Sequence, residues 1–249
     1  HIMDTAFIIG NGESRNIFPI DNLKGHGTIY GCNAIYRDHP MLCDHIVAVN
    51  PPMYEELAKW HNRGKESPRI HGLDDISEWN YICEGDSEHD VPAGLKIYRV
   101  WRGGDIKKGG KIKTNDFSKA RGSGCSAVLL AAESGIKNIV IMAFDIMGAQ
   151  QWEMETPSRI QNNIYKDTVN YPGRESMKAY LKYEWMYQLR QIFRKFPKTN
   201  FYFINRKEYL EGNPFLRWYF DQPNIKCGIY ADLQRWITGS RDDIRWKQL

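Results

Sequence analysis

The sequence predicts an α/β fold built on an open, mostly parallel sheet with helices on its faces. Three short apolar or aromatic runs each stop near an asparagine, and runs of this length that end in Gly, Asn or Pro are typical of buried strands. These runs cover residues 7–9, 30–32 and 47–49, and the asparagines that follow them are Asn11, Asn33 and Asn50. A fourth run, residues 139–144, is continuously apolar, as in the central strands of parallel sheets, and it ends at Asp145.

The remaining helices and strands are predicted from the spacing of apolar residues, from short apolar runs and from a glycine that ends a helix. Apolar residues three or four positions apart predict two amphipathic helices, and a helix of small residues is expected to end at Gly135. Short aromatic or apolar runs predict two further strands. The expected elements are a helix over residues 53–60, a short strand over 69–71, a helix over 126–134, a long helix over 175–196 and a last strand over 201–205.

The chain is expected to form one domain over residues 4–214, followed by a helical extension over 215–249. Residues 73–118 are rich in Gly, Asp and Lys and have little periodicity apart from a candidate strand at 95–100, so they are interpreted as an irregular insertion or lid. The extension interleaves aromatic and basic residues. Two interpretations fit it: helices that pack on the edge of the domain, or side chains that stack on the bases of a nucleic acid.

The composition is that of a soluble globular protein, with 42% hydrophobic and 26% charged residues. No apolar run reaches the ~20 residues of a membrane helix. Residues 1–3 resemble a cloning remnant, and nothing after them resembles a signal peptide, so a cytoplasmic location is predicted. The five cysteines are odd in number and scattered, which predicts free thiols rather than disulfides or a metal site. The net charge of +4 favours an anionic partner.

The first loop has the features of a nucleotide site. Gly10 and Gly12 allow a tight turn and a close approach to a bound group, and Ser14 is placed to cap a short helix whose free N–H groups suit a phosphate. Ligands of open α/β sheets bind outside the carboxyl ends of the strands, where this loop is expected. Arg15 stands where a dinucleotide fingerprint has its third glycine, and Asn33 replaces the acid at the end of the second strand. An NAD site is therefore disfavoured.

A second part of the site is expected after residue 120. Ser123 and Gly124 open the helix of small residues, where Ser123 is placed to cap the helix or to bind a phosphate. The irregular segment between Gly148 and Gly173 follows a strand end and is expected to overhang the crevice. It carries Trp152, Tyr165, Lys166, Asp167 and Tyr171, and Arg174 follows it directly.

The order of these motifs resembles that of the bacterial sialyltransferases of glycosyltransferase family 42. The motifs are a strand followed by Gly-Asn-Gly-x-Ser, then Cys-Asn, Asn-Pro, a Ser-Gly at a helix start and a strand that ends in Phe-Asp. Related motility-associated glycosyltransferase-like proteins and phage proteins share part of the pattern. The resemblance covers residues 6–50 and 121–205, and residues 53–118 have no counterpart. It implies a Rossmann-like, single-domain fold of the GT-A-variant type and a metal-independent transferase that uses a CMP-sugar.

The resemblance also implies roles for individual residues. Asn11 would lie beside the donor phosphate, Asn33 beside the phosphate or sugar, and Asn50 beside the ribose or donor. Asp145 would close the floor of the pocket. The resulting donor-binding residues are Gly10, Asn11, Gly12, Ser14, Arg15, Asn33, Asn50, Ser123 and Gly124.

The catalytic base of that family has no counterpart in this chain. The family uses a histidine in the loop before the long helix, whereas every histidine here lies at or before His89. Tyr171 stands near the expected position and would need Lys166 or Arg174 to lower its pKa. Carboxylates are easier bases, and tyrosines otherwise donate to phosphates. The carboxylates are Asp145, Asp167 and Glu175, and the candidate catalytic residues are Tyr171, Asp167, Asp145, Tyr165 and Arg174.

The sequence thus predicts a glycosyltransferase that moves a sugar from a CMP- or UDP-sugar to an acceptor hydroxyl, with no obligatory metal or other cofactor. Two acceptors fit: a hydroxymethylated base of phage DNA, flipped into the crevice, or a glycan. The alternative function is a non-catalytic nucleotide- or nucleic-acid-binding protein of a phage or an accessory system. The incomplete dinucleotide fingerprint argues against an oxidoreductase.

Overall fold

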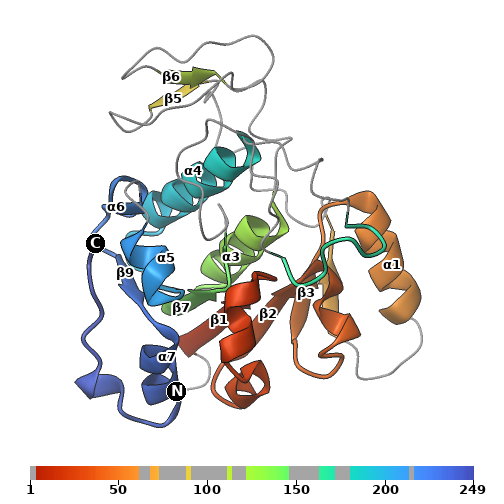
Figure 1. Ribbon diagram of the computed structural model, residues 1–249, viewed down its shortest axis with the longest axis horizontal. Helices are drawn as coiled ribbons and strands as arrows, with labels where there is room; N and C mark the ends of the chain where they lie inside the picture. The colour runs from red at the N-terminus through yellow and green to blue at the C-terminus, as the bar shows by residue number, and fades with distance from the viewer. Residues whose placement is uncertain are drawn as a thin grey trace.

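Figure 1 shows the fold as a computed structural model. The structure describes residues 4–61, 68–72, 122–145, 163–171, 180–212 and 216–249, and it describes the backbone alone at 88–90, 111–113 and 180–184.

The predicted parallel α/β sheet is confirmed. Seven strands among the described residues pair in parallel, in the order β4-β3-β2-β1-β7-β8-β9. The chain starts at the centre with β1, builds outward to β4, returns to the other side of β1 and builds outward again to β9. The strand order therefore reverses between β1 and β7, the position at which open α/β sheets bind ligands. The strands are β1 (Thr5–Ile9), β2 (Thr28–Cys32), β3 (His45–Val47), β4 (Arg69–His71), β7 (Asn138–Met142), β8 (Asn200–Ile204) and β9 (Ile225–Gly228).

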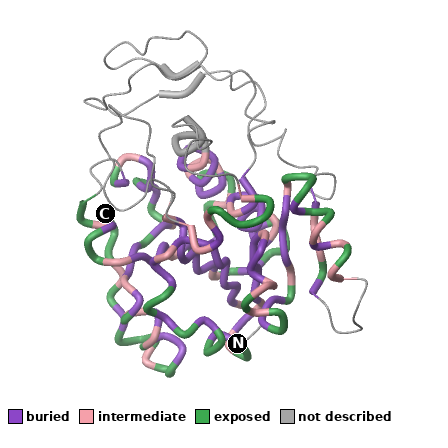
Figure 2. The backbone as a smooth tube through the Cα atoms, turned by 45° about the vertical axis from the view of Figure 1, so that its right-hand side comes forward, coloured by how far each residue is buried: buried purple, intermediate pink, exposed green. Residues whose placement is uncertain are grey.

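Successive side chains along each strand point to opposite faces of the sheet, so the hydrophobic core is divided between the two faces. In β1, Ala6 and Ile8 belong to one apolar cluster and Phe7 and Ile9 to the other, and all four are fully buried. The first face is covered by α3 (Ser123–Glu133), α4 (Tyr180–Lys195), α5 (Lys207–Glu211) and α6 (Leu216–Tyr219). The second face is covered by α1 (Pro51–His61), α7 (Tyr230–Ile237) and the short 3-10 helices η3 (Ile20–Leu23) and η4 (Asn33–Arg37). A further 3-10 helix, η2 (Glu13–Ile17), follows β1. The buried strands run between these two layers in Figure 2.

The C-terminal segment 215–249 differs from the predicted helical extension. It contains α6 and α7, but it also supplies β9, the outermost strand of the sheet, so it shares a sheet with residues 4–214. The strand was missed because it spans only four residues and alternates, with Ile225 and Cys227 buried and Lys226 exposed. The outer edge of β9 is covered in turn by Lys247, whose backbone N–H donates to the Cys227 carbonyl (3.0 Å) and whose carbonyl accepts from the Cys227 N–H (2.6 Å).

Smaller differences concern the helix ends and the insertion. The helix of small residues begins at Ser123, three residues before the predicted start, and the long helix is described from Tyr180. Within 73–118 only the backbone of β5 (Glu88–Asp90) and β6 (Lys111–Lys113) is described, as an antiparallel pair, and the candidate strand at 95–100 lies outside the described residues. None of the helices in the described ranges combines the length and hydropathy of a membrane span.

The junction of β1 and β7 predicts a steric requirement at Gly10. A Cβ atom there would lie 2.5 Å from the Ala143 carbonyl oxygen and 2.8 Å from the Phe144 ring. Gly10→Ala should lower the free energy of unfolding by about 1–3 kcal/mol in urea denaturation, the usual cost of overpacking. Gly135→Ala separates this effect from backbone strain, because Gly135 has φ +81° and open space around it and should cost about 1 kcal/mol. Unchanged stability of Gly10→Ala would contradict the close junction.

Candidate functional site

A cavity of about 230 Å³ opens at the carboxyl edge of the sheet, beside the reversal of strand order. It lies between the loops after β1, β2 and β7 and the first turn of α3. It is lined by Gly10, Asn11, Gly12, Cys32, Asn33, Gly122, Ser123, Gly124, Cys125, Ala143, Phe144, Asp145, Asn163, Tyr171 and Trp185. Eight of the predicted site residues are therefore brought together: Gly10, Asn11, Gly12, Asn33, Ser123, Gly124, Asp145 and Tyr171.

The loops after β1 and β7 are bonded to each other through their backbones. The Gly10 N–H donates to the Met142 carbonyl (2.8 Å) and the Gly12 N–H donates to the Ala143 carbonyl (2.9 Å). Ala143 adopts the left-handed conformation with φ 58°, which is strained for an alanine. A Cβ atom on Gly12 would overlap the Asp145 carboxylate. The glycines thus permit a contact between two chain segments, and this contact brings Asp145 against the first loop.

The Asp145 carboxylate joins three strand ends. Its Oδ2 accepts from the Ser14 backbone N–H (2.8 Å), and its Oδ1 accepts from the Ser14 hydroxyl (2.7 Å) and the Asn205 amide (2.9 Å). Ser14 follows β1, Asn205 follows β8, and Asp145 itself follows β7. Burial raises the pKa of Asp145, against the three hydrogen bonds, which lower it.

The predicted role of Ser14 is therefore corrected. Ser14 lies within η2 and makes no cap, and its N–H and hydroxyl are bound to a carboxylate of the protein itself. The Ser14 hydroxyl is also 2.7 Å from the Tyr230 hydroxyl. Asp145 thus occupies the place at this turn where an incoming phosphate was expected. This pairing could not be predicted from sequence patterns, because the two residues are 131 positions apart.

Asn33 and Ser123 connect the end of β2 to the start of α3. Asn33 has φ 52°, a conformation that asparagine tolerates better than most residues. The Ser123 hydroxyl donates to Asn33 Oδ1 (3.0 Å) and accepts from the Val49 N–H (3.2 Å). Ser123 is consequently not the cap of α3, since Gly122 holds that position. Asn50 is exposed and does not line the cavity, and its carbonyl accepts from the Tyr54 N–H in α1 (3.0 Å).

The first turn of α3 presents its positive end to the cavity. No side chain caps this helix and no acidic residue lies in its first turn, so its terminal N–H groups and dipole are not offset locally. Gly124 is required by packing, because a Cβ atom there would lie 2.9 Å from the Phe144 ring. Trp185, from α4, covers Gly122. The helix therefore begins in a small, partly aromatic enclosure with an electropositive end.

Asn11 lines the same cavity and has an unsatisfied side-chain oxygen. Its amide nitrogen donates to the Cys32 carbonyl (2.8 Å) and is 3.4 Å from the Tyr171 hydroxyl. Its Oδ1 is buried and has no hydrogen-bond partner within the described part of the chain, and the residue is only 7% exposed. A buried unpaired acceptor costs about 1–3 kcal/mol. A ligand hydroxyl or amine that donated to it would remove this cost.

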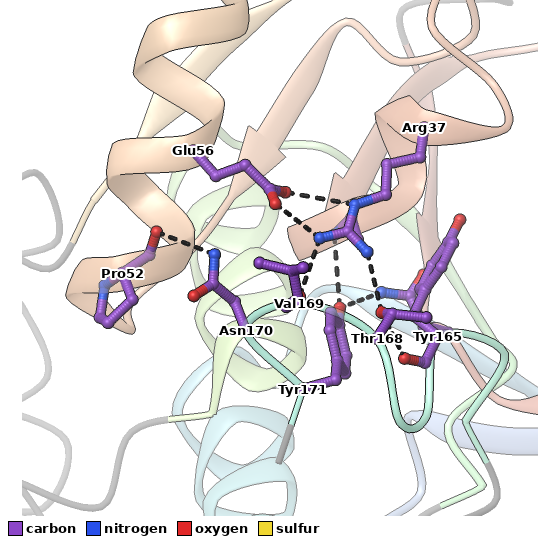
Figure 3. Close-up of polar contacts among 10 residues, drawn as sticks. Arg37, Pro52, Glu56, Tyr165, Thr168, Val169, Asn170 and Tyr171 are labelled. Carbon is purple, nitrogen blue, oxygen red and sulfur yellow. Dashed lines mark hydrogen bonds and ion pairs between the residues drawn. The ribbon is translucent and has the colours of Figure 1, made fainter. Parts of the chain in front are cut away.

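The segment 163–171 lies over this edge of the sheet and is held by Arg37 (Figure 3). Arg37 forms an ion pair with Glu56 in α1 (2.6 Å) and donates to the Thr168 hydroxyl and the Val169 carbonyl, both at 2.9 Å. At the other end of the segment, the Ile164 N–H donates to the Asn11 carbonyl (2.8 Å). Arg37 was not predicted as a site residue, and no spacing in the sequence relates it to this segment.

The Tyr171 hydroxyl accepts hydrogen bonds from the protein itself. Its hydroxyl oxygen faces the Ala34 N–H (3.3 Å) and the Asn11 amide (3.4 Å). Burial raises the pKa of Tyr171 well above its ordinary value. Lys166, expected to lower that pKa, instead forms an ion pair with Glu13 (2.7 Å). Arg174 and Glu175 lie outside the described residues.

Two other predicted catalytic residues, Tyr165 and Asp167, do not line the cavity. Burial raises the pKa of Tyr165 to about 12, and its hydroxyl accepts from Arg15 (3.1 Å), which is only 3% exposed. This bond connects Arg15, in the loop after β1, to the segment 163–171. Asp167 is exposed and adopts φ 62° in a turn. Within the described ranges, no group of three His, Cys, Asp or Glu side chains is arranged as a metal site.

Titration of Asp145 should appear in the stability of the protein. Because burial raises its pKa above 3.8, the folded state holds this proton more tightly than the unfolded chain does. The free energy of unfolding of the wild type, relative to Asp145→Asn, should therefore increase as the pH falls through the raised pKa and level off below about 3.8. Urea denaturation between about pH 3 and 8 measures this difference.

The control for this titration is Asp242→Asn, at an exposed position outside the site. The free energy of unfolding of the wild type, relative to this variant, should not show the same rise toward acid pH. The free energy of unfolding of the wild type relative to Asp145→Asn is the decisive quantity. If it is constant with pH, or grows toward alkaline pH, Asp145 is not buried as described.

Comparisons with known protein families, with curated proteins and with solved structures found no match to this chain. The functional argument consequently depends on the geometry of the cavity and its lining residues.

Proposed function

We propose that the protein is a glycosyltransferase that binds a nucleotide sugar, a CMP- or UDP-sugar, in the cavity at the start of α3. The observation that carries the proposal is the uncapped first turn of α3 in a cavity lined by Ser123, Gly124 and Asn11, whose buried amide oxygen is unpaired. The helix end suits a phosphate, and the buried amide oxygen suits a sugar hydroxyl or a base amine. Phe144 and Trp185 offer apolar surface to a ring.

The arrangement argues against a dinucleotide cofactor. In dinucleotide sites the pyrophosphate lies at the first glycine turn, whereas here Asp145 binds the N–H and hydroxyl of Ser14. The end of β2 carries Asn33 instead of a carboxylate for a ribose, and its amide oxygen already accepts from Ser123. A donor phosphate is therefore assigned to α3 rather than to the turn after β1.

The proposed chemistry uses two residues of the cavity. Tyr171 keeps its proton at neutral pH and lines the cavity, so it is assigned to donate to the departing phosphate and stabilise its charge. Asp145 is the described carboxylate that lines the cavity, and a raised pKa suits a general base that takes the proton of the acceptor hydroxyl. The proposed acceptors are a glycan hydroxyl and a hydroxymethylated base of DNA.

One observation favours a second function, the non-catalytic binding of a nucleotide. Asp145 already accepts three hydrogen bonds, which stabilise its ionised form and position it as a structural group. A protein of this kind would bind CMP or UDP without consuming a nucleotide sugar. Incubation with a panel of CMP- and UDP-sugars separates the two functions, because slow hydrolysis of the donor is expected only of a transferase.

Nucleotide binding is tested by Asn33→Gly, which keeps the left-handed backbone and removes the amide. We expect CMP or UDP to bind at least about fivefold more weakly by isothermal titration calorimetry, the equivalent of losing one hydrogen bond of about 1 kcal/mol. Asn170→Gly is the matched control, since Asn170 has φ 64° and does not line the cavity. Equal affinities for both variants and the wild type would remove the nucleotide from this cavity.

The proposed proton donor is tested by Tyr171→Phe. The change removes the hydroxyl but keeps the ring, so sugar transfer or donor hydrolysis should slow at least about tenfold while the donor affinity stays within about twofold. Tyr202→Phe, whose hydroxyl is not in the cavity, is the control. An equal loss of affinity and rate would make Tyr171 a binding residue instead.

A further inference from the structure

A second cavity, of about 800 Å³, lies at the β9 edge of the sheet. It is formed by α5, the beginning of α7, β9 and the C-terminal segment 245–249, and we call it the β9 groove. Its lining contains five basic and two acidic side chains: Lys207, Arg217, Arg235, Arg245 and Lys247, with Glu211 and Asp232. No residue lines both this groove and the cavity at α3.

The acidic side chains of the groove are already paired. Lys207 lies 3.7 Å from Glu211, and Arg235 forms an ion pair with Asp232. The remaining three cations, Arg217, Arg245 and Lys247, are exposed, and none has an acidic partner among the residues that the structure describes. The β9 groove therefore contains uncompensated positive charge.

The C-terminal segment places two of these cations on either side of a packed tryptophan in the chain. Trp246 packs against Tyr202 and Trp236, with ring centroids 5.0 and 5.3 Å away. Arg245 and Lys247 flank it in the chain and line the groove. Lys247 forms an antiparallel bridge with Cys227, and residues two apart on backbone of this kind are separated by about 6–7 Å. This separation is close to that of successive phosphates along an extended nucleic-acid strand.

We propose that the β9 groove binds the phosphodiester backbone of a single nucleic-acid strand. Arginine matches phosphate oxygens with a planar fork of donors, and two of the three unpaired cations are arginines. The groove contacts the phosphates of the nucleic acid and does not stack on its bases, because the aromatic side chains nearby are already packed against other protein groups. Trp218 stacks under Arg190 at 4.3 Å, and Trp236 is 5% exposed. Such contacts give affinity without sequence preference.

The test uses the full chain and a fluorescein-labelled oligodeoxythymidylate of about 12 nucleotides, with anisotropy measured from about 50 to 200 mM NaCl. The variant Arg217→Gln/Arg245→Gln/Lys247→Gln should bind at least about tenfold more weakly than the wild type at 50 mM salt. The slope of log K against log salt should become less steep by about 2, because three phosphate contacts are lost.

The control variant Lys137→Gln/Arg194→Gln/Lys198→Gln removes the same charge from exposed positions outside the groove. It should bind the oligonucleotide within about twofold of the wild type. The proposal is overturned if the control weakens binding as much as the groove variant does, or if the wild type does not bind at 50 mM salt. It is also overturned if an oligoglutamate peptide of equal charge competes as well as unlabelled oligonucleotide, which would make the groove a surface for acidic peptides.

The affinity of the groove variant for CMP and UDP, measured by titration, tests the groove independently of the proposed transferase site. The nucleotide affinity should equal that of the wild type, since none of the three substituted residues lines the cavity at α3. A groove variant that loses nucleotide and oligonucleotide binding together would overturn the assignment of a separate site.

Discussion

The hydrogen bonds to the Asp145 carboxylate determine the shape of the candidate site. One side chain joins the ends of β1, β7 and β8, through Ser14 and Asn205, at the position where the strand order reverses. Hydrogen bonds to a charged group are each worth about 1.5–3 kcal/mol, and the cost of burying the carboxylate opposes them. Burial has the larger effect on its ionisation and raises the pKa of Asp145. Gly12 is needed because any larger residue would displace this carboxylate.

This internal carboxylate changes where an anion is able to bind. In open α/β proteins the turn after the first strand commonly receives a phosphate, and here that turn is already bound to a negative group. The other helix start at the same edge, α3, has neither a capping side chain nor an acid in its first turn. Tyr171 is held against Asn11 and Ala34 before any ligand arrives, because Arg37 fixes the segment that carries it. In the proposed transferase, this arrangement would present the Tyr171 hydroxyl to the departing phosphate without rearrangement.

Sequence patterns predicted the sheet well and the polar contacts poorly. The buried strands could be predicted because continuous apolar runs such as 139–144 have few alternatives, whereas β9 is short, alternates and lies at an edge. The strand-end residues Asn11, Asn33 and Asp145 were predicted to share one edge, and they line one cavity. Their partners could not be predicted, since the bond from Ser14 to Asp145 spans 131 positions and that from Ser123 to Asn33 spans 90. Asn205 carried the same strand-end signal and could have been included.

The central claim is that a donor phosphate binds at the start of α3 and not at the turn after β1. A crystal structure of the protein soaked with CMP or UDP tests it most directly. The account predicts phosphate density within hydrogen-bond distance of the Ser123 and Gly124 N–H groups, with the bonds between Asp145 and Ser14 intact. Phosphate density on the Ser14 N–H, with Asp145 displaced, would contradict it.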